Sequence, residues 1–211
     1  MIAVAQAFRP AGAVAIRIIL VRHGKPDGMS AKGISGRGIG EWVRGYDSVG
    51  ISRTLEPPAR VRALAMQATC FIASDLPRAR ESAAWLAGTR RVIHDRDLRE
   101  AVLPESLGIS LTLPPGVWVV VARLAWFLNW GNANETVAAT HARAARIANG
   151  LAVLAAEHGC VMAVGHGLFN RFLAGELRRR GWRGPKVLPG GYWGAAAFEC
   201  ETMKTAAPRQ G

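Results

Sequence analysis

Cysteine and lysine are both scarce in this chain of 211 residues. Its three cysteines, Cys70, Cys160 and Cys200, are too few and too scattered for a disulfide framework or a zinc site. Cys70 and Cys160 each open a short apolar run, where a reduced thiol packs as a small hydrophobic group. We therefore expect free thiols, no bound metal and a cytoplasmic location.

Long hydrophobic runs are also missing. Val117–Trp130 is strongly apolar and aromatic, but it has 14 residues with Arg123 in the middle, whereas a membrane span needs about 20. The apolar residues 1–15 are interrupted by Arg9-Pro10 and lack a cationic start, which argues against a signal peptide. We expect no stable membrane insertion. The segment 117–130, with Trp118, Trp126, Phe127 and Trp130, is predicted to be core, a homodimer contact, or a lid or apolar wall over a pocket.

Acidic residues are few beside the basic ones. Lys+Arg is 27 against 15 for Asp+Glu, which gives a formal net charge of +12, while half of the residues are hydrophobic. That composition excludes a disordered, collagen-like or coiled-coil chain. Only four of the cations are lysines, and arginine suits bidentate contact with carboxylate or phosphate. The excess of arginine predicts an anionic partner. The cluster Arg178–Arg180 fits a solvated helix end, and no nucleic-acid-binding motif accompanies it, so we do not expect that partner to be nucleic acid.

What is present is an alternation of apolar runs and helical stretches. Strands are predicted at Arg17–Val21, Cys70–Ala73, Arg91–Ile93, Cys160–Val164 and Trp193–Phe198. Helices are predicted around Glu41–Tyr46, from Pro57 to Ala68, at Leu76–Ala87 with Ser74 or Asp75 as its cap, at Glu135–Glu157, and from Gly167 to Arg180. This pattern predicts an α/β three-layer sandwich with a mostly parallel central sheet flanked by helices. We expect one domain over 17–198, an extension over 1–16 and a tail without fixed structure over 199–211.

Polar residues follow three of the predicted strands, where ligands bind in such folds. They are Arg22-His23-Gly24, Ser74-Asp75 with Arg78, and Gly165-His166-Gly167. Two histidines with two arginines suit a tetrahedral phosphate dianion, because arginine forks hold its oxygens and a neutral imidazole supplies a nucleophile near pH 7. A carboxylic acid would then be needed to protonate the leaving oxygen.

These elements, in this order, resemble the histidine phosphatase superfamily, which includes the cofactor-dependent phosphoglycerate mutases. The resemblance covers roughly Arg17–Phe198 and rests on Arg22-His23-Gly24, Ser74-Asp75-Leu76-Pro77-Arg78-Ala79 and Gly165-His166-Gly167. It implies a phosphoglycerate mutase-like fold and a histidine acid phosphatase-type phosphomonoester hydrolase without a cofactor. It further implies that His23 accepts the phosphoryl group, that Arg22, Arg78 and His166 complete the phosphate pocket, and that Glu100 of Leu98-Arg99-Glu100 is the general acid.

The chain departs from the family pattern in two places. The glycine and tryptophan that many members carry after the acidic residue are replaced by Ala101-Val102-Leu103-Pro104-Glu105, so Glu105 is a substitute candidate for the acid. After the nucleophile the chain reads Gly24-Lys25-Pro26-Asp27, which favours a hydrolase over a mutase-like phosphotransferase. A non-catalytic phosphoanion-binding protein is a third reading. The expected partner is a small phosphorylated substrate.

Overall fold

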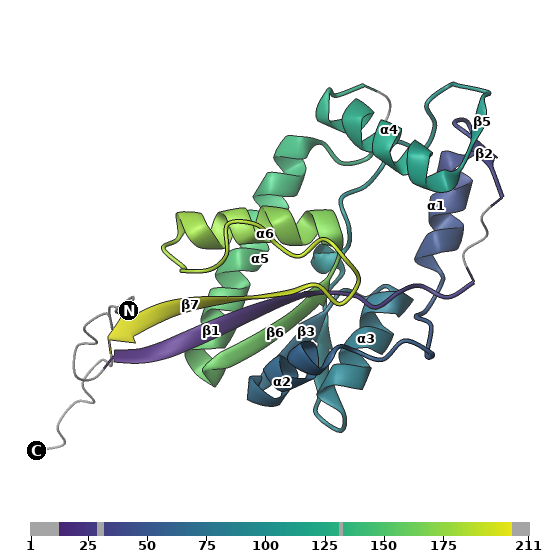
Figure 1. Cartoon of the computed structure of the whole chain (residues 1–211). Helices are drawn as coiled ribbons and strands as arrows, with labels where there is room; N and C mark the ends of the chain where they lie inside the picture. The colour runs from purple at the N-terminus through teal and green to yellow at the C-terminus, as the bar shows by residue number, and fades with distance from the viewer. Residues whose placement is uncertain (1–12, 29–31, 131–132, 204–211) are drawn as a thin grey trace, which may run out of the picture.

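The structure, a computed structural model, describes residues 13–28, 32–130 and 133–203 and is built around a five-stranded sheet (Figure 1). The strand order is β4-β3-β6-β1-β7. Four strands run parallel, and β7 pairs antiparallel with β1 at one edge. The strands are β1 (Ala13–Arg22), β3 (Cys70–Ala73), β4 (Val92–His94), β6 (Cys160–Gly165) and β7 (Ala195–Met203). The α/β class and the mostly parallel sheet are thus confirmed.

Strand β1 shows why these runs form the centre of the sheet. Ile18 and Leu20 belong to one buried apolar cluster, and Ile19 and Val21 belong to another on the opposite face. Successive side chains of a strand point to opposite faces, so a strand covered on both sides must be apolar at every position. Burial of β1 on both faces therefore explains why its residues form a continuous apolar run in the sequence.

Helices cover both faces of the sheet. The helices α2 (Ala59–Gln67) and α3 (Pro77–Ala87) pack on one face, and α5 (Val137–His158) and α6 (Gly167–Arg179) pack on the other (Figure 1). In α5 the buried positions recur every three or four residues, as an amphipathic helix requires. The helix ends at Gly159, whose φ of +81° suits glycine.

A smaller unit projects from the sandwich, and we call it the cap. It consists of β2 (Ile34–Ser35), α1 (Ile39–Asp47), β5 (Thr112–Leu113) and α4 (Pro115–Phe127) (Figure 1). Its own small core contains Ile39, Leu103, Trp118 and Ala122. The Trp118 Nε1–H donates a 2.8 Å hydrogen bond to the carbonyl of Ile34 and ties α4 to β2. A short 3₁₀ helix, η1 (Arg96–Leu98), follows β4 and leads toward the cap.

The two ends of the predicted domain are displaced in the structure. Strand β1 begins at Ala13 and β7 continues to Met203, and the ladder pairs these two residues. The prediction of an extension through residue 16 is therefore wrong for 13–16, and that of a tail is wrong for 199–203; residues 1–12 and 204–211 lie outside the described residues. Because β7 is an edge strand, charged residues such as Glu199, which pairs with Arg17, are tolerated in it.

The start of α3 also differs from expectation. Its N-cap residue is Leu76, with no capping hydrogen bond from its side chain, and Pro77 opens the helix. Ser74 Oγ accepts a 3.4 Å bond from the Leu76 N–H, while the carboxylate of Asp75 binds Arg99 through two 2.6 Å hydrogen bonds. The Asp75 side chain therefore binds Arg99 and does not cap α3. Within the described residues, no helix combines the length and apolarity that crossing a membrane would need.

Candidate active site

Three strands deliver the candidate residues to one edge of the sheet. Arg22 pairs in register with Gly165, so that His23 and His166 follow the ends of neighbouring parallel strands. The backbone N–H groups of His23 and Ser74 each donate a 3.0 Å bond to β6, at the carbonyls of Gly165 and Val164. The rings of His23 and His166 lie 5.0 Å apart between centroids, tilted by 59°. Parallel pairing therefore gathers residues from three distant stretches of sequence.

His23 is held with one nitrogen occupied. Its Nδ1 lies 2.7 Å from the carbonyl oxygen of Gly24, and since a carbonyl can only accept, Nδ1 carries the proton. In the neutral ring the lone pair is then on Nε2. Only 2% of the residue is exposed, and burial, followed by the effect of His166, lowers its pKa well below 6.5. The site thus holds a neutral imidazole with a free nucleophilic nitrogen.

His166 is equally buried and faces a hydroxyl. Its Nε2 lies 3.0 Å from Ser74 Oγ, which itself accepts from the Leu76 N–H. Burial, and then the positive charges of Arg78 and Arg22, lower the pKa of His166 well below 6.5. When the Ser74 hydroxyl donates to Nε2, the ring proton sits on Nδ1, which makes His166 a neutral hydrogen-bond donor.

Arg78 is fixed at the start of α3 and is 1% exposed. Its Nη1 donates to the carbonyl of Tyr46 and its Nη2 to the carboxylate of Asp47, both at 2.9 Å. The guanidinium also lies 4.3 Å from the centroid of the Tyr46 ring. These contacts from the end of α1 fix the plane of the guanidinium and leave its Nε–H for another partner.

Arg22, like Arg78, is held by a backbone carbonyl and a tyrosine ring. Its Nη1 donates to the carbonyl of Gly190, and its guanidinium lies 4.7 Å from the centroid of the Tyr192 ring. A Cβ at Gly167 would lie 3.3 Å from Arg22 Nε, so glycine there lets the arginine lie against the start of α6.

The two arginines share an unmet requirement. The Nε atoms of Arg22 and Arg78 are buried and have no hydrogen-bond partner in the part of the chain that the structure describes. A buried charged donor without a partner is costly, because its hydration is lost and nothing replaces it. An anion bound between the two arginines, beside two neutral histidines, would compensate their positive charge. The arrangement is therefore a cradle for an oxyanion such as phosphate.

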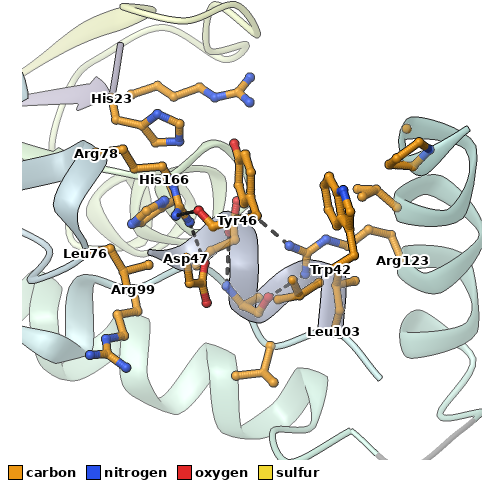
Figure 2. Close-up of a pocket in the computed structure, with 18 of the residues that line it drawn as sticks. His23, Trp42, Tyr46, Asp47, Leu76, Arg78, Arg99, Leu103, Arg123 and His166 are labelled. Carbon is orange, nitrogen blue, oxygen red and sulfur yellow. Dashed lines mark hydrogen bonds and ion pairs between the residues drawn. The ribbon is translucent and has the colours of Figure 1, made fainter. Parts of the chain in front are cut away.

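The cradle lies in a pocket of about 570 Å³ between the sheet edge and the cap (Figure 2). Arg22, His23, Arg78, Glu100 and His166, the five residues singled out in the sequence, all line it. The substitute acid Glu105 does not: its carboxylate accepts a 3.2 Å bond from Asn134, and its backbone carbonyl accepts from Gly40. The structure thus brings Glu100, and not Glu105, to the pocket.

Glu100 is anchored at the start of α6. Its Oε1 accepts from the N–H groups of Ala101 and Phe169, at 3.0 and 2.8 Å, and its Oε2 accepts from Leu168 at 3.1 Å. The guanidinium of Arg123, on α4, lies 3.9 Å from Oε2. These contacts fix the orientation of the Glu100 side chain.

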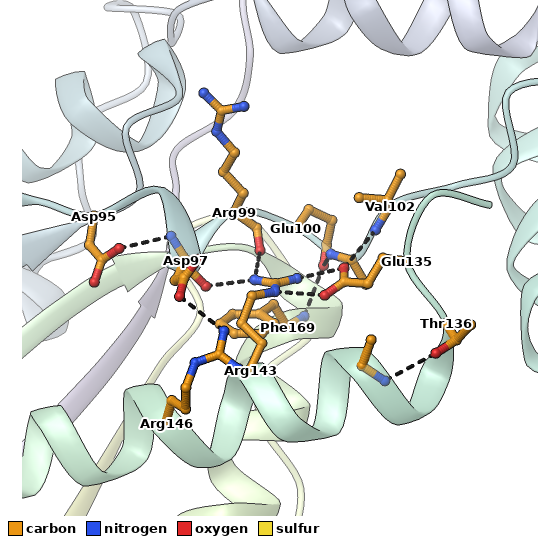
Figure 3. A network of polar contacts seen from close by, with 12 residues as sticks. Asp95, Asp97, Arg99, Glu100, Val102, Glu135, Thr136, Arg143, Arg146 and Phe169 are labelled. Carbon is orange, nitrogen blue, oxygen red and sulfur yellow. Dashed lines mark hydrogen bonds and ion pairs between the residues drawn. The ribbon is translucent and has the colours of Figure 1, made fainter.

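A partly buried ion pair supports the segment that carries Glu100 (Figure 3). Arg143 of α5 binds both carboxylate oxygens of Glu135, at 2.7 and 2.8 Å, and its Nη1 donates to the carbonyls of Asp97 and Arg99. Glu135 in turn accepts from the N–H of Val102 at 3.4 Å. Because these bonds hold the chain before and after Glu100, Arg143 and Glu135 position that residue without touching the cradle.

Of the alternatives left open for the aromatic segment, core is confirmed for Trp118 and Trp126, whereas a pocket wall is not found. Trp118 and Trp126 are buried inside the molecule, while Phe127 and Trp130 are 48% and 60% exposed, and none of the four lines the pocket. The helical period explains this, since α4 presents Pro115, Gly116, Val119 and Arg123 to the pocket instead. The lid or wall interpretation is therefore wrong for these aromatic residues.

Sequence reasoning missed three residues that shape the cradle: Tyr46, Asp47 and Tyr192. Tyr46 and Asp47 end α1 and bind Arg78, and the Tyr192 ring lies 5.8 Å from that of His23. Burial raises the pKa of Tyr46 to about 12, so its phenol stays protonated. A pair of tyrosines without characteristic spacing gives no signal in the sequence. Among the residues that the structure describes, no cluster of three or more His, Cys, Asp or Glu could hold a metal ion.

Comparison with known proteins gives a family and a set of similar folds. The family model of the histidine phosphatase superfamily (branch 1) matches residues 18–201. Among solved structures, mycobacterial hydrolase 2 is 23% identical with a TM-score of 0.58, over 88% of this chain and 82% of that chain. Mycobacterial glucosyl-3-phosphoglycerate phosphatase is 22% identical with a TM-score of 0.54, over 78% and 80%. A phosphoserine phosphatase mutant from Entamoeba histolytica is 13% identical with a TM-score of 0.53, over 88% and 94%. These likenesses show a shared fold. No curated protein matches the sequence.

Proposed function

The chain belongs to the histidine phosphatase superfamily (branch 1), and we propose that it is a phosphatase that hydrolyses a phosphomonoester through a phosphohistidine at His23. One observation carries the proposal: two arginines, each held in place by protein contacts, line one pocket together with two neutral histidines. The substrate is proposed to be a small phosphorylated molecule in the cytoplasm, and the reaction is proposed to need no metal.

In the first step, the substrate phosphate docks between Arg22 and Arg78, whose guanidinium groups donate to its oxygens. His166 supplies a further donor once Ser74 holds its Nε2. The side chains are held in place before the substrate arrives, so that little reorganisation is needed as charge develops on the equatorial oxygens. The cations also offset the negative charge that would otherwise repel a nucleophile.

His23 Nε2 then attacks the phosphorus in line with the ester oxygen. The P–N bond forms as the P–O ester bond breaks, and Glu100 donates its proton to the leaving alkoxide. The step starts from the protonated acid, and the second step regenerates that form. The Nδ1–H of His23 keeps its hydrogen bond to the Gly24 carbonyl throughout. This carbonyl stabilises the positive charge on the phosphorylated ring.

In the second step, water attacks the phosphohistidine. Glu100, now a carboxylate, takes a proton from the water as the new P–O bond forms and the P–N bond breaks. Inorganic phosphate leaves, and His23 returns to its neutral state with a free Nε2. One carboxyl group serves as acid and then as base, which restores the site after each turnover.

The test is phosphate release from a panel of small phosphomonoesters by the wild type and by His23→Ala. We expect turnover by the wild type, inhibition by vanadate, no effect of a chelator, and no turnover by His23→Ala with the fold retained by circular dichroism. Oxygen-labelled water distinguishes the reactions: label in the released phosphate supports hydrolysis, whereas transfer to a second hydroxyl indicates a phosphotransferase. Phosphate binding without turnover of any ester would indicate the non-catalytic reading.

A further inference from the structure

The pocket extends well beyond the phosphate cradle. A phosphate group has five heavy atoms, whereas pockets of roughly 300–1,000 Å³ hold drug-sized ligands, and this pocket measures about 570 Å³. The remaining space lies toward the cap, where α1 and α4 face each other (Figure 2). What lines that space decides which alcohol the site accepts.

Its walls are mostly apolar. Trp42 and Val43 of α1, Leu103, and Pro115 and Val119 of α4 all line the pocket. Trp42 stacks on Tyr46 with ring centroids 5.3 Å apart and planes 9° apart. Tyr46 in turn lies under the guanidinium of Arg78. A continuous aromatic surface therefore leads from the cradle to the cap.

The charged groups beyond the cradle already have partners. Arg99 is bound by both oxygens of Asp75. Arg123 donates to the carbonyl of Ala101 at 2.7 Å and faces Glu100. Those contacts engage the cations that line this part of the pocket. A second anionic group of the ligand would compete with Asp75 and Glu100 for these guanidinium groups, whereas an apolar group would not.

We propose that the substrate alcohol carries an apolar group of about the size of an aromatic ring, which lies along Trp42 and Tyr46 against Val119 of the cap. The inference rests on the proposed phosphatase function and adds the class of leaving group. Burial of the ring against these side chains supplies the selectivity, because apolar surface gains free energy when it leaves water.

Two alkyl phosphates test this directly: ethyl phosphate and 2-phenylethyl phosphate, whose leaving alcohols have similar basicity. For the wild type we expect kcat/KM to be about 10- to 100-fold higher for the 2-phenylethyl ester, as expected from burying one ring. Trp42→Ala removes the stacking surface and should bring the ratio of the two kcat/KM values toward one.

Gly116 offers a second variant that should not impair folding. It lines the pocket in the first turn of α4, and a Cβ there meets no heavy atom within 4 Å. Gly116→Leu places a side chain in the proposed ring site and should lower the same ratio. Gly150→Leu is the matched control, because Gly150 is an exposed glycine of α5 that is also free of contacts within 4 Å. It should leave both kcat/KM values unchanged.

The outcomes separate the two claims. If the wild type hydrolyses both esters equally well and His23→Ala hydrolyses neither, the apolar site is refuted and the phosphatase function stands. If neither ester nor any other phosphomonoester is hydrolysed, the proposed function itself fails. A preference for the 2-phenylethyl ester that persists in both Trp42→Ala and Gly116→Leu also refutes the site, because the selectivity would then arise elsewhere.

Discussion

His23 and His166 lie with their ring centroids 5.0 Å apart at the ends of two neighbouring parallel strands. Each ring is almost fully buried, and both are next to the guanidinium groups of Arg22 and Arg78. Protonation of either imidazole would place a further positive charge beside these cations, away from water. The cluster therefore resists protonation, which keeps one ring available as a nucleophile.

This cluster makes stability depend on pH. In the unfolded chain both imidazoles titrate near 6.5, whereas in the fold burial lowers both pKa values well below that. Below pH 6.5 the unfolded state thus binds more protons, and the free energy of unfolding falls, by at most about 1.4 kcal/mol per pH unit for each ring. Urea unfolding from pH 7.5 to 5, in phosphate-free buffer, should show a shallower fall for His166→Gln. An unchanged slope would contradict this; the exposed His158→Gln is the control.

Arg78→Lys tests the planar cradle. Lysine keeps the charge, but its single ammonium cannot hold Asp47 and the Tyr46 carbonyl and also bind a phosphate oxygen in the fixed plane of a guanidinium. We expect kcat/KM to fall about 10²- to 10³-fold and inhibition by inorganic phosphate to weaken, measured by steady-state kinetics. Arg80→Lys, at an exposed position of the same helix, should behave as the wild type. Wild-type kinetics in Arg78→Lys would exclude this arginine from phosphate binding.

Glu100→Gln tests the acid. An amide cannot protonate an alkoxide, so turnover of an alkyl phosphate should fall about 10²- to 10⁴-fold. Phosphoryl transfer from 4-nitrophenyl phosphate, seen as the burst of nitrophenolate in rapid mixing, should fall far less, because that leaving group needs no proton. Glu105→Gln should leave both rates unchanged, since Glu105 binds Asn134 away from the pocket. Equal losses for the two substrates would assign Glu100 a structural role.

Gly24→Ala tests the close packing behind the nucleophile. A Cβ at Gly24 would lie 2.5 Å from Cζ2 of the buried Trp193, so either the ring or the strand end must shift. We expect a loss of about 1–3 kcal/mol in the free energy of unfolding, together with lower activity, because the Gly24 carbonyl orients His23. Gly45→Ala, in α1 with no atom within 4 Å of the new Cβ, should be neutral or stabilising. Similar effects of both changes on stability would contradict the account.

The residues of the site that could be predicted from the sequence are those that lie at or near the ends of the parallel strands. Cys70–Ala73 is both the predicted and the observed strand, because a run buried on both faces must be apolar throughout. Once the strands are known, the carboxyl ends of parallel neighbours must meet. His23, His166 and Arg78 could therefore be placed together from the sequence, whereas their catalytic roles stay a proposal.

The rest depends on contacts between distant segments that leave no periodic signal. The bonds from Arg143 to the carbonyls of Asp97 and Arg99 join α5 to a loop more than forty positions away. The anchoring of Glu100 by α6 likewise requires the relative position of two elements. Residue type alone could not show that Trp118 faces the cap core while Val119 faces the pocket, because that depends on the rotation of α4.

The central claim is a covalent phosphoryl group on His23, and rapid quenching into alkali followed by peptide mass spectrometry tests it most directly. After mixing with a turned-over ester, we expect an acid-labile phosphoryl group on the wild-type peptide that contains His23. It should be absent from His23→Ala, which should not turn over substrate. Turnover by His23→Ala, or a wild-type enzyme whose phosphoryl group forms on another residue, would contradict the account.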